Sequence, residues 1–146
     1  MFKVVLTPLS MVKIVLLSCV SKKLPGRAKA QDLYISPLFC YGLRYARSLK
    51  PDKIFILSAK YGLVGLNDVI DTYNLSLNSM GVSQIKLWSD GVLEQLRLVS
   101  DLHNDTFIFL AGDRYRKYLL SHINHYEIPL QGLGLGRQLQ FLKGSA

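Results

Sequence analysis

Short apolar runs recur at four places along this chain, and each run stops at small or polar residues. Continuous runs of β-branched and other apolar residues are typical of parallel strands that are buried on both faces. We therefore predict strands at residues 12–17, 53–57, 106–110 and 127–130.

Longer stretches with apolar residues at helical spacing separate these runs. The first predicted helix begins at Asp32, a possible N-cap, and ends at Leu49, with Pro37 in its first turn or at a break after a short turn. The other predicted helices span residues 83–100, with Ser83 as N-cap, 114–123 and 137–143. The pattern predicts irregular structure for residues 20–31, 66–80 and the glycine-rich segment 131–136.

This alternation of strands and helices predicts an α/β fold. We expect a single three-layer domain at residues 11–146, with a mostly parallel, Rossmann-like sheet of four or five strands. Residues 1–10 form a predicted N-terminal extension, because Met11 opens the first strand. The apolar runs are shorter than the roughly 18 residues of a membrane helix. The sequence therefore predicts a soluble protein without a membrane partner.

The charge of the chain changes the picture of its partners. A formal net charge of +8 and a pI near 9.6 favour anionic partners, such as nucleotides, nucleosides or nucleic acid. The alternative is that the positive charge is spread over the surface and only aids solubility. Basic residues cluster at 22–29 and 114–117. Two cysteines are too few for a disulfide framework, so we expect a cytoplasmic protein.

Polar and small residues follow the predicted strands, and parallel strands present their carboxyl ends to one edge of a sheet. Small residues there allow close backbone approach, and hydroxyl or ammonium groups bind polar or anionic ligands. The predicted substrate-binding residues are Ser18, Lys22, Lys23, Tyr34, Ser58, Tyr61, Gly62, Gly112 and Tyr115. Alternatively, Ser58 and Lys60 are ordinary loop residues and residues 61–62 form only a turn.

Two carboxylates and one ammonium group are candidates for catalysis. Asp68 and Asp71 lie in the long middle loop, where either could be a general acid or base or orient a ribose hydroxyl. The alternative is that they cap turns beside Asn67 and Asn74. Lys60 is the third candidate, because its ammonium group follows the second predicted strand directly.

Cys19 is a candidate nucleophile. The nearby Lys22 and Lys23 would favour its thiolate, although a small buried cysteine at a strand end is the commoner case. We predict no metal site, because the three histidines lack matching cysteine or carboxylate spacing; they are His103, His122 and His125. A P-loop and a dinucleotide-binding glycine fingerprint are both absent after the first strand.

The chain resembles a family of bacterial and phage proteins that is catalogued as a domain of unknown function. The segments that carry the resemblance are Ser18-Cys19-Val20-Ser21-Lys22-Lys23-Leu24-Pro25, Ala30-Gln31-Asp32-Leu33-Tyr34, Ser36-Pro37-Leu38-Phe39, Leu57-Ser58-Ala59-Lys60-Tyr61-Gly62-Leu63 and residues 73–77. More distantly, the chain is similar to the peroxide-stress DNA-binding family and the archaeosine synthase core. These resemblances imply a connection with nucleic acids or modified bases. The chain departs from both in length and lacks an obvious helix-hairpin-helix segment, and Thr72 stands where the family of unknown function has proline.

Together these observations predict an enzyme that binds a nucleotide, nucleoside or modified nucleobase at the carboxyl edge of the sheet. N-glycosidic or group-transfer chemistry by a hydrolase or transferase, without a cofactor, is the expected reaction. The alternative is a non-catalytic nucleic-acid-binding module that uses the same basic residues on phosphates. A scaffold protein with a vestigial pocket is the third possibility, and the sequence leaves homodimerisation open.

Overall fold

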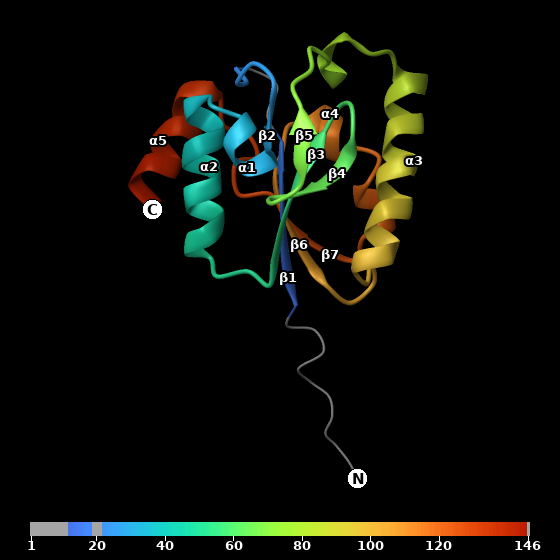
Figure 1. Ribbon diagram of the computed structural model, residues 1–146. Coiled ribbons are helices and arrows are strands. Elements are labelled where there is room, and N and C mark those ends of the chain that lie inside the picture. The colour runs from blue at the N-terminus through green and yellow to red at the C-terminus, as the bar shows by residue number, and fades with distance from the viewer. Residues whose placement is uncertain (1–11, 19–21, 146) are drawn as a thin grey trace.

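The computed structural model describes residues 12–18 and 22–145, and the predicted extension at residues 1–10 lies outside this part of the chain. The fold is mixed α/β (Figure 1). Its strands are β1 (Lys13–Ser18), β2 (Arg27–Lys29), β3 (Lys53–Ser58), β4 (Gly62–Gly65), β5 (Val69–Asp71), β6 (Thr106–Leu110) and β7 (His125–Glu127). Its helices are α1 (Ala30–Leu33), α2 (Pro37–Ser48), α3 (Val82–Val99), α4 (Asp113–Arg116) and α5 (Leu135–Ser145), with short 3-10 helices η3 (Leu77–Ser79) and η4 (Leu120–His122).

The main sheet has five strands in the order β4-β3-β1-β6-β7. Strands β1, β3, β6 and β7 are parallel, whereas β4 pairs antiparallel with β3. Strand β1 lies in the middle, and its Ile14–Leu17 segment is at most 2% exposed. The continuous apolar pattern of this strand therefore follows from burial on both faces.

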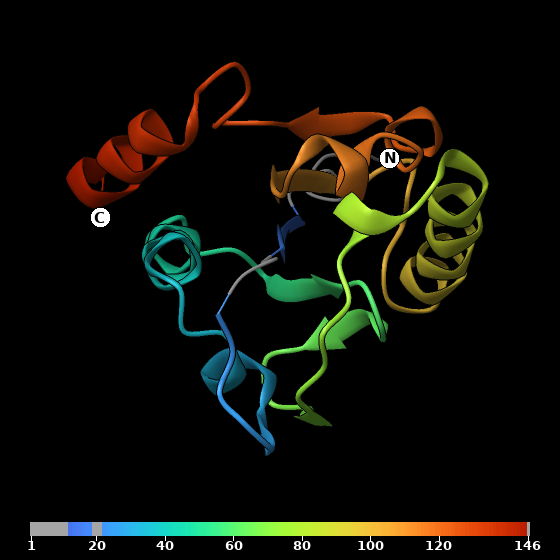
Figure 2. The same ribbon diagram turned by 90° about the horizontal axis from the view of Figure 1, so that it is seen from above.

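Alternate side chains of the central strands pack into two separate hydrophobic clusters. Ile14 and Leu16 pack with residues of α3, whereas Val15 and Leu17 pack with residues of α2. Figures 1 and 2 show α2 and α5 on one side of the sheet and α3 on the other. Within residues 12–18 and 22–145, no helix combines the length and the apolar character needed to cross a membrane.

The structure corrects several predicted boundaries. Helix α2 begins at Pro37 rather than after Asp32, because the Ser36 hydroxyl accepts the backbone N–H of Phe39 at 3.3 Å and so caps the helix. The predicted helix at 114–123 was too long, since it comprises α4 and the separate η4. Strand β7 at His125–Glu127 begins two residues before the predicted strand at 127–130 and shares only Glu127 with it.

Strand β4 and a two-stranded arm were not predicted. Strands β2 and β5 pair antiparallel within segments that the sequence pattern had suggested were irregular. Backbone bonds extend this pairing by one residue at each end: Ala30 donates to the Asp68 carbonyl at 2.8 Å and Thr72 donates to the Gly26 carbonyl at 2.8 Å. Both strands have three residues, too few for a clear alternation of apolar and polar positions.

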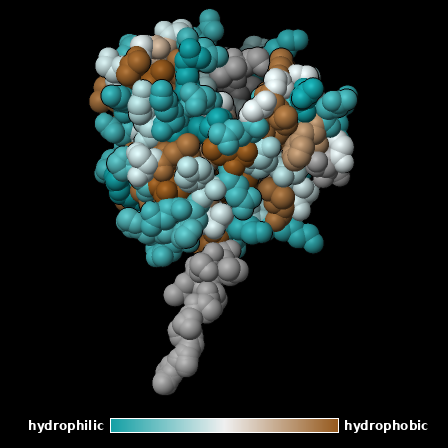
Figure 3. Space-filling model, turned by 180° about the vertical axis from the view of Figure 1, so that it is seen from behind, coloured by the Kyte–Doolittle hydropathy of each residue, from teal (hydrophilic) through white to brown (hydrophobic). Residues whose placement is uncertain are grey.

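The surface seen from behind carries hydrophobic side chains in separate patches between hydrophilic ones (Figure 3). The most exposed large apolar side chains of the described residues include Leu98, at 86%, and Leu87, at 73%, both on α3. Single exposed leucines are common on folded proteins. We therefore base no functional argument on them.

Candidate ligand-binding site

Three of the predicted site residues meet at the carboxyl edge of the sheet. Ser18 ends β1 and pairs with Leu57 of β3, so it lies beside Ser58. Leu17 pairs with Leu110 of β6. The backbone N–H of Gly112 donates to the Ser18 hydroxyl at 3.3 Å. The loops that follow β1, β3 and β6 are therefore neighbours, as the parallel order requires.

A cavity of about 640 Å³ lies at the ends of β1 and β6. Strand β1 has β3 on one side and β6 on the other, so the order of the parallel strands reverses at this point. Ligands in open α/β sheets bind in the crevice at such a reversal. The polar and charged residues in its wall include Ser18, Ser36, Asn78, Arg114, Arg116, Lys117, Gln131 and Gln138.

Three cationic residues of the cavity wall come from α4 and the residue that follows it. Arg116 has only 14% of its side chain exposed and donates to the Ala111 carbonyl at 2.7 Å. Its guanidinium also lies 4.0 Å from the carboxylate of Asp113. Arg114 and Lys117 are exposed, and Arg114 donates to the Asn78 side-chain oxygen at 3.3 Å. Arg114 and Lys117 are therefore available to an anion, whereas Arg116 also holds the turn after β6.

Tyr115 lines the same cavity but is 3% exposed. Its hydroxyl accepts the backbone N–H of Leu77 at 3.4 Å, and its ring packs edge-on against Trp88 at a centroid distance of 5.6 Å. The Trp88 indole N–H in turn donates to the Ser58 carbonyl at 2.9 Å. Tyr115 and Trp88 therefore join the cavity wall to the end of β3.

A cluster of hydroxyl groups lies on the β3 side of β1. The Ser58 hydroxyl, fully buried, accepts the backbone N–H groups of Lys60 at 3.2 Å and Tyr61 at 3.0 Å. It donates to the hydroxyl of Tyr73 at 3.0 Å, which lies 2.7 Å from the hydroxyl of Tyr34. Serine and two phenols thus form a continuous chain of hydrogen bonds.

Lys23 completes this tyrosine cluster, which consists of Lys23, Tyr34, Ser58 and Tyr73. The Lys23 ammonium lies 4.6 Å from the ring centroid of Tyr73 and 5.9 Å from that of Tyr34. A cation at this distance is attracted to the electron-rich face of an aromatic ring. Tyr73 was absent from the predicted site, although its segment was one of those that carried the family resemblance.

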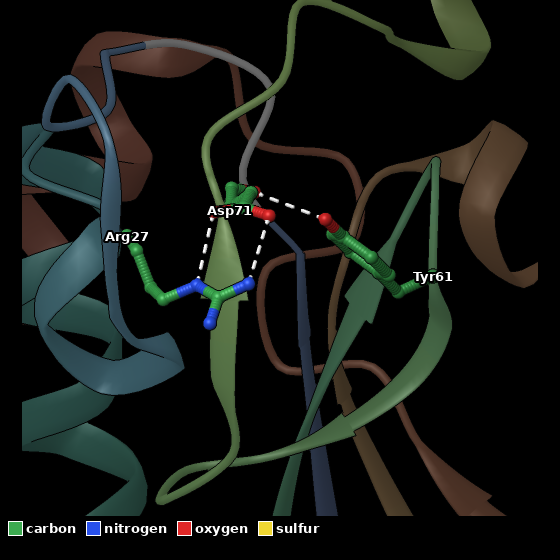
Figure 4. Close-up of polar contacts among 3 residues, drawn as sticks. All are labelled: Arg27, Tyr61 and Asp71. Carbon is green, nitrogen blue, oxygen red and sulfur yellow. Dashed lines mark hydrogen bonds and ion pairs between the residues drawn. The ribbon is translucent and has the colours of Figure 1, made fainter.

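Arg27 and Tyr61 hold Asp71, the last residue of β5 in the arm (Figure 4). The Arg27 guanidinium donates two hydrogen bonds to the Asp71 carboxylate, at 3.1 and 3.2 Å. The Tyr61 hydroxyl donates to the Asp71 carbonyl at 3.2 Å, and the Tyr61 ring packs edge-on against Tyr73. Hydrogen bonding to Arg27, the charge of Arg27 and the charge of Lys60 lower the pKa of Asp71. A carboxylate held in this way is a poor general base near neutral pH.

Replacing Asp71 with asparagine is expected to lower stability near neutral pH and to have no effect at low pH. Because the pKa of Asp71 in the folded protein lies below its ordinary value of 3.8, the ion pair contributes stability above that pH. The contribution disappears as the pH falls through the lowered pKa. Urea midpoints of both proteins at pH 7 and at pH 2–3 would measure this, provided that both fold at the lower pH. Since both side chains are exposed, 0.5 M salt should shrink the difference at pH 7; an unchanged difference at pH 2–3 would contradict the assignment.

The other predicted residues lie around this edge in different ways. Lys60 is exposed, with its ammonium 5.2 Å from the ring centroid of Tyr61, and Lys22 is also exposed. The Asp68 carboxylate accepts the backbone N–H of Gly65 at 2.8 Å, so it closes the turn after β4. Cys19 lies outside the described residues. None of Lys60, Asp68 and Asp71 lines the cavity.

Two groups of predicted residues can therefore be distinguished, one on each side of the end of β1. Seen from above, the arm lies on the β3 side and α4 lies on the β6 side (Figure 2). Ser18, Gly112 and Tyr115 line the cavity. Tyr34 and Ser58 belong to the tyrosine cluster, and the ring of Tyr34 packs against Phe39, a cavity residue, at 5.2 Å. Among the described residues, no three His, Cys, Asp or Glu side chains gather as a metal site would require.

Residues 14–144 match the model of DUF6884, a family of unknown function. The chain belongs to this family. The match covers the main sheet from Ile14 onward and helices α1–α4, together with the cavity and the tyrosine cluster. The resemblance to a family of unknown function that the sequence segments indicated is thus confirmed. No curated protein matches the chain.

Proposed function

We propose that the protein is an enzyme that binds a nucleotide, nucleoside or modified nucleobase in the cavity at the carboxyl edge of the sheet. The observation that carries the proposal is the position of the cavity at the reversal of strand order, with the cations Arg114 and Lys117 in its wall. Sheets of this kind bind phosphorylated ligands at that point. A Rossmann-like, three-layer arrangement and a cytoplasmic location are parts of the same proposal.

The lining of the cavity matches the two chemical parts of a nucleotide. Leu130 and Leu133, both half-buried, supply apolar surface for a base or sugar, and a volume of about 640 Å³ falls within the roughly 300–1,000 Å³ typical of small-molecule sites. Arg114 and Lys117 supply donors for a phosphate. Gln131 and Gln138 carry amide groups that can hydrogen-bond the edge of a base. Among the three ligand classes, this combination favours the nucleotide.

The tyrosine cluster is the best source of acid–base chemistry beside the cavity. Ser58 uses its hydroxyl oxygen to accept two backbone N–H groups, so its own proton is directed to Tyr73. Tyr73 can then donate to Tyr34, which packs against the cavity residue Phe39. Because Ser58, Tyr73 and Tyr34 do not line the cavity, a phenol of this chain exchanges a proton with the glycosidic or group-transfer centre of a hydrolase or transferase reaction through a bridging water.

Thermal melting with nucleoside monophosphates, nucleosides and free bases tests the proposal. A ligand at about 100 times its Kd stabilises the folded state by about 2.7 kcal/mol, and the melting temperature should rise by roughly 5–10 °C for a chain of this size. Arg114→Ala should remove most of that shift for the monophosphate, because a hydrogen bond to a charged group contributes about 1.5–3 kcal/mol. A nucleoside lacks the phosphate, so its smaller melting-temperature shift should be the same in Arg114→Ala as in the wild type.

Two control variants test whether the loss of the melting-temperature shift is specific to residues of the cavity wall. Arg97→Ala removes an exposed arginine near the end of α3 and should leave the shift unchanged. Lys60→Ala should also leave it unchanged, since Lys60 does not line the cavity. Loss of the shift in Lys60→Ala with retention in Arg114→Ala would move the binding site to the β3 side of β1, where the tyrosine cluster lies. Binding without conversion of any bound ligand would favour the non-catalytic nucleic-acid-binding module.

A further inference from the structure

Positive charge continues beyond the cavity on the surface formed by α3 and the segment around α4. The ammonium groups of Lys86, on α3, and Lys117 lie 5.4 and 5.6 Å from the ring centroid of Tyr118. Tyr118 and Lys117 line the cavity, and Lys86 directly follows the cavity residue Ile85. We call Lys86, Arg114, Lys117 and Tyr118 the basic rim.

The three cations of the basic rim make no ion pair with a carboxylate of the described residues. Lys86, Arg114 and Lys117 are exposed, and in the part of the chain that the structure describes none of them forms an ion pair. The carboxylate of Asp113 lies near Arg116 instead. Since like charges close together repel one another, this arrangement favours an anion that spans several of them.

Lys86 does not line the cavity wall, so it adds a cation to the rim outside the cavity. A free mononucleotide with its phosphate at Arg114 and Lys117 brings only one phosphate to the three cations of the basic rim. A polynucleotide carries a phosphate on each side of the bound nucleotide and can reach Lys86 as well. Proteins that hold such strands combine a basic groove with aromatic side chains.

We propose that the nucleotide bound in the cavity belongs to a single-stranded nucleic acid, whose adjoining phosphates lie along the basic rim. The proposal rests on the nucleotide-binding function above. A single strand is required because a nucleotide inside a cavity must leave its base pair and its stack, and an unpaired strand does so at the lowest cost. The protein therefore binds the strand through its phosphates and the enclosed nucleotide through the cavity.

Fluorescence anisotropy with labelled 12-nucleotide DNA and RNA strands tests the proposal. Lys86→Gln and the matched variant Arg97→Gln each remove one positive charge from an exposed position of α3. We expect Lys86→Gln to weaken binding about 3- to 10-fold at low salt and to reduce the salt slope by about 1, as for the loss of one phosphate contact. Arg97→Gln should stay within about twofold of the wild type.

The outcomes distinguish this inference from the proposed function. Equal weakening in both variants would mean that net charge alone attracts the strand, and a duplex bound as tightly as a single strand would overturn the single-strand requirement. A mononucleotide shift without tighter oligonucleotide binding would overturn this inference and leave the proposed function standing. If neither the mononucleotide nor the oligonucleotide binds, the proposed function itself is contradicted. The mononucleotide shift of Lys86→Gln should equal that of the wild type, which also shows that the variant is folded.

Discussion

Replacing Gly62 with alanine should destabilise the protein by about 3 kcal/mol, through backbone strain and steric overlap together. Gly62 has a φ of +75°, a left-handed conformation that costs an L-residue about 1–2 kcal/mol. A Cβ atom at this position would lie 2.3 Å from the side-chain oxygen of Gln95. Gln95 can move away only by giving up the hydrogen bond that its oxygen accepts from the backbone N–H of Leu63 at 2.9 Å.

Urea unfolding of Gly62→Ala beside Gly91→Ala measures this effect. Gly91 lies in the exposed middle of α3 with nothing within 4 Å of an added Cβ, so its replacement should stabilise by about 0.5–1 kcal/mol. In a Gln95→Ala background the overlap disappears, and Gly62→Ala should cost only about 1–2 kcal/mol. An equal cost in both backgrounds would show that the contact with Gln95 has no role.

Replacing Ser58 with alanine should destabilise the protein by about 2–3 kcal/mol, because the neighbouring polar groups lose a buried partner. The Ser58 hydroxyl accepts the N–H groups of Lys60 and Tyr61 and donates to Tyr73, and the residue is fully buried. An alanine methyl group of nearly the same size can do none of this. The turn between β3 and β4 and the tyrosine cluster should both loosen.

Chemical denaturation of Ser58→Ala measures this loss of stability, and Ser48→Ala serves as the control. Ser48 is exposed and donates to the Tyr45 carbonyl at 2.6 Å at the end of α2, so its loss should cost less than about 0.5 kcal/mol. Hydrogen exchange at the amides of Lys60 and Tyr61 should speed up in Ser58→Ala. Similar stabilities for the two variants would contradict the central role of the Ser58 hydroxyl.

The pattern of apolar residues predicted the central part of the fold well. Strands β1, β3 and β6 lie within one residue of the predicted bounds, since burial on both faces requires a continuous apolar run that is easy to recognise. The predicted end of the first helix at Leu49 lies one residue beyond the end of α2 at Ser48, whereas its start was not predicted. Asp32 and Ser36 are both suitable N-caps by residue type, and the choice depends on packing.

The sequence predicted that the loops after several strands meet at one edge of the sheet. In the structure, the predicted residues of these loops form two separate groups. Ser18 and Gly112 line the cavity, whereas Ser58 and Tyr34 belong to the tyrosine cluster on the other side of β1. The sequence order gave no means of separating them, because both groups follow strands of the same sheet. Whether these residues act on a ligand stays a prediction.

The sequence by itself determined the α/β class, the parallel central strands and the family, because these depend on local periodicity and on motifs that are read within single segments. Only the tertiary structure decided that Asp71 pairs with Arg27, that Asp68 closes a turn and that Tyr73 joins Tyr34 and Ser58. Each of those contacts needs a specific side-chain direction, often between residues far apart in the chain. Such directions follow from strand order, register and packing, which local patterns do not contain.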